Sequence, residues 1–148
     1  YDPFLKAFAA EANQLVRAGW CGSEDADDGV DYSCSISIDA PTGGVLLMSG
    51  SIDVYLAATP GADFLSCMFK SGTPESGMAE VPTTRRDIDV QLPGNQESDC
   101  ATDGALVVGP GSHTISFVTE SVDSAKFGDA GAYVLFVPFD GAGSPLGG

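Results

Sequence analysis

Short runs in which apolar and polar residues alternate constrain the fold of this chain most strongly. Between residues 33 and 38, serine alternates with Cys34, Ile36 and Ile38, and the segment Asp87–Leu92 alternates in the same way. A period of two sends successive side chains to opposite faces of a β-strand. Glycine and proline, 19 and 9 residues, separate these runs with turn signals. The pattern therefore predicts many half-buried strands joined by turns.

The same reasoning applied along the chain predicts about eight strands after Ser33. No helical pattern lies between them, so a parallel sheet, which needs crossover helices, is not expected. We expect an all-β fold, an antiparallel two-sheet β-sandwich of jelly-roll type, with loops at Ser71–Thr84 and Pro93–Gly104. A Gly50-Ser51 turn is expected to join two strands as a hairpin. The predicted strands are Ser33–Ile38, Val45–Ser49, Ile52–Leu56, Phe64–Lys70, Ile88–Leu92, Ala105–Val108, His113–Thr119 and Ala132–Phe139. The predicted core is Ile36, Ile38, Leu47, Val54, Leu56, Leu65, Phe69, Ile88, Val90, Ile115, Phe117, Leu135 and Val137.

A helix is expected before the strands, from about Pro3 to Ala18. Asp2 is a suitable N-cap, proline suits the first helical position, and Gly19 is a natural end. The apolar residues recur every three or four positions and form one stripe, which packs on its own domain or docks on a neighbouring subunit. This gives four expected parts: an amphipathic helix at 1–20, an acidic loop at 21–33, the β-sandwich at 34–139 and a glycine-rich flexible tail at 140–148.

Charge and hydropathy exclude two classes of partner. The 148 residues carry 21 acidic and 6 basic side chains, a formal net charge of −15. Nucleic acid binding needs clustered Lys and Arg, and the only basic cluster is Arg85-Arg86. That pair meets an acidic patch of another copy or marks two solvated ends of a loop. The longest apolar run, Ala132–Phe139, is far shorter than the ~20 residues of a membrane-spanning helix.

The four cysteines indicate an oxidising compartment. The first residue is Tyr1, so we expect a mature secreted or cell-surface protein from which a signal peptide has been removed. An even number of cysteines and a single histidine favour two disulfides over a zinc site. Of the three possible connectivities, we favour Cys21–Cys34, which closes the acidic loop, and Cys67–Cys100, which ties a strand to a later loop.

The segment from Glu24 to Asp31 is the strongest candidate for a metal site. Calcium prefers six to eight oxygen ligands from closely spaced carboxylates and carbonyls. The spacing fails the EF-hand pattern, because its glycine falls one place early and no Glu occupies the last position. Either a looser Ca²⁺ site or a solvated acidic loop remains open. The candidate ligands are Glu24, Asp25, Asp27, Asp28 and Asp31.

No constellation in the sequence indicates catalysis. His113, the only candidate base, follows Ser112 in a predicted strand, so the two side chains point to opposite faces. We interpret the histidine as a residue at the rim of the core. Two suitably placed carboxylates would suffice for glycoside hydrolysis, but nothing in the sequence favours any pair. Trp20 is expected to be a structural anchor; the other reading is a sugar-stacking platform with Tyr32, Tyr55 and Tyr133.

Three stretches resemble secreted bacterial jelly-roll domains of the C1q/TNF-like type over about residues 33–139. They are Ile38–Leu47, with its Ala-Pro-Thr-Gly-Gly turn, Gly109–Ile115, and Ala132–Pro138. The resemblance implies a non-catalytic domain that assembles or binds through its surfaces. The expected function is a structural or adhesive extracellular module that acts by self-association, as a closed oligomer or as the subunit of a filament. The alternative is a module that binds carbohydrate or glycoprotein.

Overall fold

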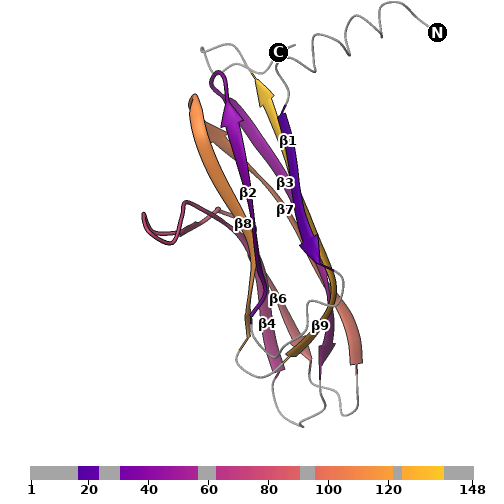
Figure 1. Cartoon of the computed structure of the whole chain (residues 1–148). Helices are drawn as coiled ribbons and strands as arrows, with labels where there is room; N and C mark the ends of the chain where they lie inside the picture. Colours follow the sequence, from indigo (N-terminus) through magenta and orange to yellow (C-terminus); the bar gives the residue numbers. More distant parts are fainter. Residues whose placement is uncertain (1–16, 24–30, 57–62, 91–95, 122–124, 139–148) are drawn as a thin grey trace, which may run out of the picture.

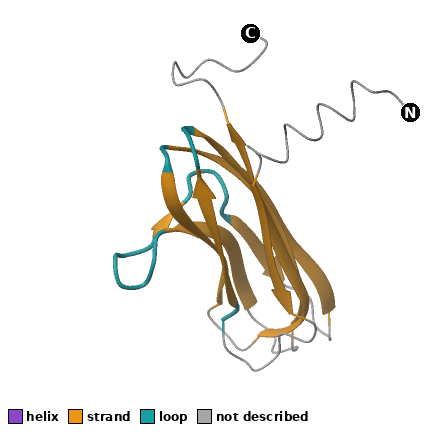
Figure 2. Ribbon diagram, turned by 45° about the horizontal axis from the view of Figure 1, so that its top comes forward, coloured by secondary structure: helices purple, strands orange, loops and turns teal. Residues whose placement is uncertain are grey.

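Two antiparallel sheets packed face to face form the described part of the protein. The computed structural model describes residues 17–23, 31–56, 63–90, 96–121 and 125–138 (Figure 1). Within these ranges the chain forms strands, turns and loops, without a helix (Figure 2). The strands are β1 (Arg17–Ser23), β2 (Ser33–Ala40), β3 (Gly44–Leu56), β4 (Asp63–Ser71), β5 (Ala79–Glu80), β6 (Arg86–Val90), β7 (Gln96–Val108), β8 (Gly111–Ser121) and β9 (Ala125–Pro138).

The strand order identifies a jelly-roll sandwich, as the sequence predicts. Sheet A has the order β1-β9-β3-β7, and sheet B has the order β2-β8-β4-β5, with β6 also paired to β4. The chain changes sheet at every connection except those between β4, β5 and β6, which all belong to sheet B. All pairings are antiparallel.

The core lies between the sheets and is filled by the inward-facing residues of both. Ile36, Phe69 and Phe117 of sheet B meet Leu46 and Phe136 of sheet A, all buried. Seven of the predicted core residues are buried as expected and Ile88 is half-buried against the core, whereas the side chains of Leu56 and Val90 lie outside the described residues. The seven are Ile36, Ile38, Val54, Leu65, Phe69, Ile115 and Phe117.

Three predicted core residues instead face outward. Leu47 is exposed, Leu135 is half-buried and Val137 is exposed, while their neighbours Leu46, Val134 and Phe136 are fully buried. β3 and β9 carry apolar residues at successive positions, so alternation does not identify which face is inner. The prediction placed these side chains on the wrong face of the correct strands.

The expected hairpin at Gly50-Ser51 is also wrong, because β3 runs unbroken through both residues. A Cβ atom on Gly50 would lie 3.0–3.1 Å from ring atoms of Phe117 on the facing sheet. The glycine therefore gives an aromatic ring room to pack against the middle of a strand.

Two further boundaries differ from the prediction. Arg17–Ser23, expected as the end of the helix and the start of the acidic loop, is strand β1, paired with β9. Within the described residues the sandwich therefore begins at Arg17 and not at Cys34. The rest of the expected helix lies outside the described residues, as does the glycine-rich tail. Residues 96–104, expected as loop, belong to β7, in which Asp99 and Asp103 face solvent while Cys100 and Thr102 are buried.

Both predicted disulfides are formed, and each joins sheet A to sheet B. Cys21 of β1 bonds Cys34 of β2, and Cys67 of β4 bonds Cys100 of β7. The two bonds therefore link the sheets at opposite sides of the sandwich. Cys100 was expected in an exposed loop, but it is fully buried.

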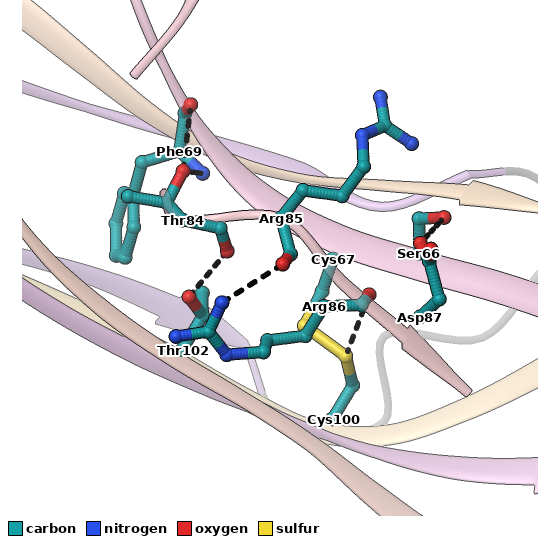
Figure 3. Close-up of a disulfide and its surroundings, with 9 residues drawn as sticks. All are labelled: Ser66, Cys67, Phe69, Thr84, Arg85, Arg86, Asp87, Cys100 and Thr102. Atoms are coloured by element: carbon teal, nitrogen blue, oxygen red, sulfur yellow. Dashed lines mark hydrogen bonds between the residues drawn. A yellow bond between two sulfur atoms is a disulfide. The ribbon is translucent and has the colours of Figure 1, made fainter. Parts of the chain in front are cut away.

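Two buried threonines, Thr84 and Thr102, lie near the Cys67–Cys100 disulfide (Figure 3). Their hydrogen bonds hold the segment before β6 against β4 and β7. Thr84 Oγ1 accepts a hydrogen bond from the Phe69 amide at 3.1 Å and donates one to the Val81 carbonyl at 2.8 Å. Thr102 of β7 donates to the Thr84 carbonyl. These bonds satisfy polar groups that would otherwise be buried at a cost.

Candidate association face

The outer faces of the two sheets differ in chemistry. On sheet B, polar side chains pair with one another: Ser35 with Ser116 at 2.8 Å, and Ser66 with Asp87 at 2.6 Å. Lys70 binds Glu120 at 2.8 Å. The polar groups on this side of sheet B therefore already have partners within the chain, and Ser66 and Ser116 are buried.

The outer face of sheet A instead presents apolar side chains to solvent. The exposed fractions are 79% for Trp20, 71% for Val107, 58% for Tyr133, 42% for Leu47 and 36% for Val137. These residues come from all four strands of the sheet, so they belong to one continuous surface. Large apolar side chains clustered in this way mark an interaction surface more often than scattered ones do.

The outward residues of neighbouring strands are register partners, so they form rows that run across the sheet. Val137, Val45 and Val107 form one row, and Ala18, Leu135, Leu47 and Ala105 form the next. We call Val45, Leu47, Val107, Leu135 and Val137 the apolar end. No charged side chain occupies an outward position in these two rows within the described residues.

The third row brings two aromatic residues together. Trp20 of β1 stands opposite Tyr133 of β9, and the same row continues to Ser49 and Asp103. Tyr133 separates two hollows of the surface. One is lined by Leu47, Ala105, Leu135 and their neighbours. The other, which we call the trough, is lined by Trp20, Tyr133, Ser49, Ser51, Ala101 and Gly131.

The trough shows which parts of the aromatic prediction hold. Trp20 is not a buried anchor, because its indole is largely exposed on a strand. Tyr32 is not part of the platform; its ring meets the core ring of Phe117 with centroids 6.4 Å apart. The side chain of Tyr55 lies outside the described residues. Of the four aromatic residues, Trp20 and Tyr133 lie together on the exposed face, and a sugar-stacking role for them stays a prediction.

Carboxylates occupy the far end of the same face. Asp53 of β3 lies opposite Asp99 of β7. A hydrogen bond to Asp99 is the main cause that raises the pKa of Asp53, with desolvation and the neighbouring charge adding to it; the backbone N–H of Asp129 acts in the opposite direction. With Asp103, these groups make the outer face of sheet A apolar at one end and acidic at the other.

The predicted calcium ligands lie almost entirely beyond this description. Glu24, Asp25, Asp27 and Asp28 are outside the described residues, and Asp31 is an exposed residue just before β2. The described residues contain no group of three or more His, Cys, Asp or Glu arranged to hold a metal ion. Ca²⁺ binding stays a prediction.

The basic pair finds its partners within the chain. Arg85 Nη2 lies 2.9 Å from Glu80 and 3.2 Å from Glu120, and the Arg86 guanidinium donates to the carbonyls of Thr83 and Arg85. The Glu120 pKa is lowered, chiefly by its hydrogen bond from Lys70. Arg85 is therefore paired with two carboxylates of its own chain, while Arg86 bonds to backbone carbonyls and remains exposed.

His113 lies at the rim of the sandwich, half-buried, as predicted. Its Nε2 atom is 2.7 Å from the Gly109 carbonyl oxygen, which makes that nitrogen the donor. Ser71 at the end of β4, Thr73 and Ser76 of the following loop, and Ser112 line an open pocket beside it. Because Nε2 carries the proton, the lone pair of the neutral imidazole is on Nδ1.

The protein is thus an antiparallel jelly-roll sandwich with an apolar outer face on sheet A. Among solved structures it is similar to "Structure of Eiger TNF from S. frugiperda", with a TM-score of 0.48 and 12% identity over 88% of this chain and 97% of that one. No family model and no curated protein matches the sequence. No helix in the part of the chain that the structure describes is long and apolar enough to cross a membrane.

Proposed function

We propose that this protein is a non-catalytic extracellular module that self-associates through the apolar end of sheet A. The observation that carries the proposal is that β3 and β9 are apolar on both faces at the apolar end. The inner residues of these strands fill the core, yet Leu47, Leu135 and Val137 face outward. An antiparallel sheet with one solvated face usually alternates apolar residues inward and polar residues outward, and the apolar end departs from that pattern.

A second copy is the occupant that best fits the apolar end. The chain carries a formal charge of −15, so two copies repel one another wherever acidic groups meet. The apolar end is the part of this face without charged outward residues in the described chain, so two copies can approach there at the lowest electrostatic cost. Tyr133 stands beside the hollow lined by Leu47, Ala105 and Leu135, which gives the surface both a projection and a recess. A face with both features can be self-complementary.

The extracellular location is supported by the two disulfides. Both join strands of opposite sheets, so both are part of the sandwich framework. Such bonds persist in oxidising compartments. The expected assembly is a closed oligomer or a filament, and the fold is compatible with either.

Sedimentation velocity over a concentration series tests the proposal. We expect a species larger than the 15.1 kDa monomer whose fraction rises with concentration. Leu47→Lys, at the centre of the apolar end, should shift the protein to monomer. Ser37→Lys, exposed on the outer face of sheet B, makes a similar change in charge and should leave association intact. A monomer at every concentration, or equal effects of the two substitutions, would overturn the proposal.

The alternative function, carbohydrate or glycoprotein binding, is supported by a different set of residues. Trp20 and Tyr133 give the sheet an exposed aromatic pair beside hydroxyl groups. These residues lie next to the apolar end, and Tyr133 borders both hollows.

A further inference from the structure

The trough on sheet A combines three features within one hollow. Its walls include the exposed rings of Trp20 and Tyr133, and its lining includes the hydroxyls of Ser49 and Ser51. Small residues, Ala101 and Gly131, keep it open. Binding sites for small polar molecules typically join apolar or aromatic surface with a few polar groups that fix orientation.

The small residues form a row of their own across the sheet. Gly22, Gly131, Ser51 and Ala101 are register partners on the four strands. Neighbouring strands lie about 4.8 Å apart, so a row of four spans about 14 Å. This length suits a short oligosaccharide better than a single sugar ring.

Gly131 keeps the trough open although a side chain would fit there. A Cβ atom on this glycine would meet nothing closer than the Cys21 carbonyl oxygen, at 4.0 Å. The backbone there does not adopt the positive φ that would favour glycine. Neither packing nor backbone conformation therefore requires a glycine at residue 131. The absence of a side chain there leaves the trough open beside Trp20 and Tyr133.

The charges around the trough restrict the ligand. Asp103 lies in the aromatic row, and Asp53 and Asp99 each lie two residues beyond the small-residue row on β3 and β7. Outward positions of the described residues bring no basic side chain into these rows. A ligand bearing carboxylate or sulfate groups would be repelled, while hydroxyl groups can donate to the carboxylates.

We infer that the trough binds an uncharged oligosaccharide, with a pyranose ring stacked on Trp20 and Tyr133. The apolar face of the sugar ring covers the indole, and its hydroxyls reach Ser49, Ser51 and the bordering carboxylates. The aromatic rings provide a large contact area at a small cost in conformational entropy, because each turns about two torsions only. This inference does not depend on self-association.

Trp20 is the only tryptophan of the chain, so its fluorescence reports directly on the trough. We would first screen a glycan array and then titrate the protein with an uncharged tetrasaccharide from it, such as cellotetraose or chitotetraose. The tetrasaccharide is expected to change the emission of Trp20 in a saturable way. Tetragalacturonate, a matched acidic ligand, is expected to bind at least tenfold more weakly.

Two substitutions test whether the trough itself is the site. Gly131→Val fills the floor with a side chain that the strand accommodates, and it should weaken binding at least tenfold with little change in melting temperature. Ser51→Val changes the neighbouring position in the same row and provides a second test if the first variant does not fold. Ser37→Val on sheet B is the matched control and should bind as the unmodified protein does.

Several results would overturn the inference. These are the absence of binding to every uncharged glycan, a preference for acidic glycans or basic peptides, and undiminished binding by Gly131→Val and Ser51→Val. A Trp20 signal that changes only with protein concentration would assign the trough to a second copy instead. Leu47→Lys separates the two claims, because it should abolish self-association and leave sugar binding intact.

Discussion

Asp53 and Asp99 lie directly opposite each other on β3 and β7, on the outer face of sheet A. The pKa of Asp53 is raised, chiefly by its interaction with Asp99. Like charges directly opposite each other in a sheet destabilise the folded state.

The first prediction follows from the sign of this pKa shift. Because the pKa of Asp53 is raised above its ordinary value of 3.8 in the folded protein, its stabilising proton is present at low pH. That stabilisation is lost as the pH rises through the raised pKa. Asp53→Asn should therefore raise the melting temperature at pH 7 and reduce the loss of stability above pH ~4.

Melting curves from pH 3.5 to 7.5 would check this prediction. Asp39→Asn, an exposed position on β2, removes the same charge from sheet B and serves as the control. If both substitutions raise the melting temperature equally, the effect is one of net charge and the opposed pair has no special role.

The second prediction concerns Gly50 and Phe117. Any Cβ at residue 50 would press on the ring of Phe117 at 3.0–3.1 Å, so Gly50→Ala must displace a fully buried side chain. Overpacking of this kind costs about 1–3 kcal/mol. Urea unfolding should show that loss for Gly50→Ala, while Gly131→Ala, which points into open space, should unfold within about 0.5 kcal/mol of the unmodified protein. Similar midpoints for the two variants would contradict the packing described here.

A third prediction concerns the buried disulfide. Cys67 and Cys100 join the two sheets and are separated by 33 residues in sequence. Replacing both by Ala should cost about 2–5 kcal/mol, because the unfolded chain is freed and two buried side chains are shortened. Calorimetry of Cys67→Ala/Cys100→Ala would measure the loss. An unchanged melting temperature would show that the hydrogen bonds of Thr84 and Thr102 hold this region without the covalent link.

The fourth prediction is that calcium stabilises the protein through the segment from Glu24 to Asp31. The Cys21–Cys34 disulfide joins the ends of the chain that contains these five acids, so they stay near one another. A ligand at ~100 times its Kd stabilises the folded state by ~2.7 kcal/mol. The melting temperature in millimolar CaCl₂ should be higher than in NaCl of equal ionic strength. The double substitution Asp25→Asn/Asp27→Asn should remove this difference. Equal shifts in the two salts would identify a solvated acidic loop.

The fold was largely predictable because alternation is a local property of the sequence. The Ser33–Ile38 run shows only one possible inner face, and its isoleucines are buried as expected. Both disulfide pairs were also predictable from four cysteines, an acidic segment between the first two and the exposed setting expected for Cys100, although that setting itself proved wrong.

The candidate face was less predictable, because a strand with apolar residues on both faces carries no internal sign of which is inner. Leu47 and Val137 were therefore assigned to the core, although they lie on the surface that matters most for the proposed function. The uninterrupted apolar run from Ala132 to Phe139 could have indicated this face. A strand without polar residues places apolar side chains on its outer face as well as in the core. The prediction assigns Arg17 and Ala18 to the helix because Gly19 is interpreted as its end, whereas both residues belong to β1.

The most direct test of self-association through the apolar end is the concentration dependence of methyl NMR shifts in the unmodified protein. We expect dilution to change the methyl signals of Val45, Leu47, Val107, Leu135 and Val137, while that of Thr114 on sheet B stays constant. Methyl shifts that do not respond to dilution, or that respond on sheet B, would contradict the account.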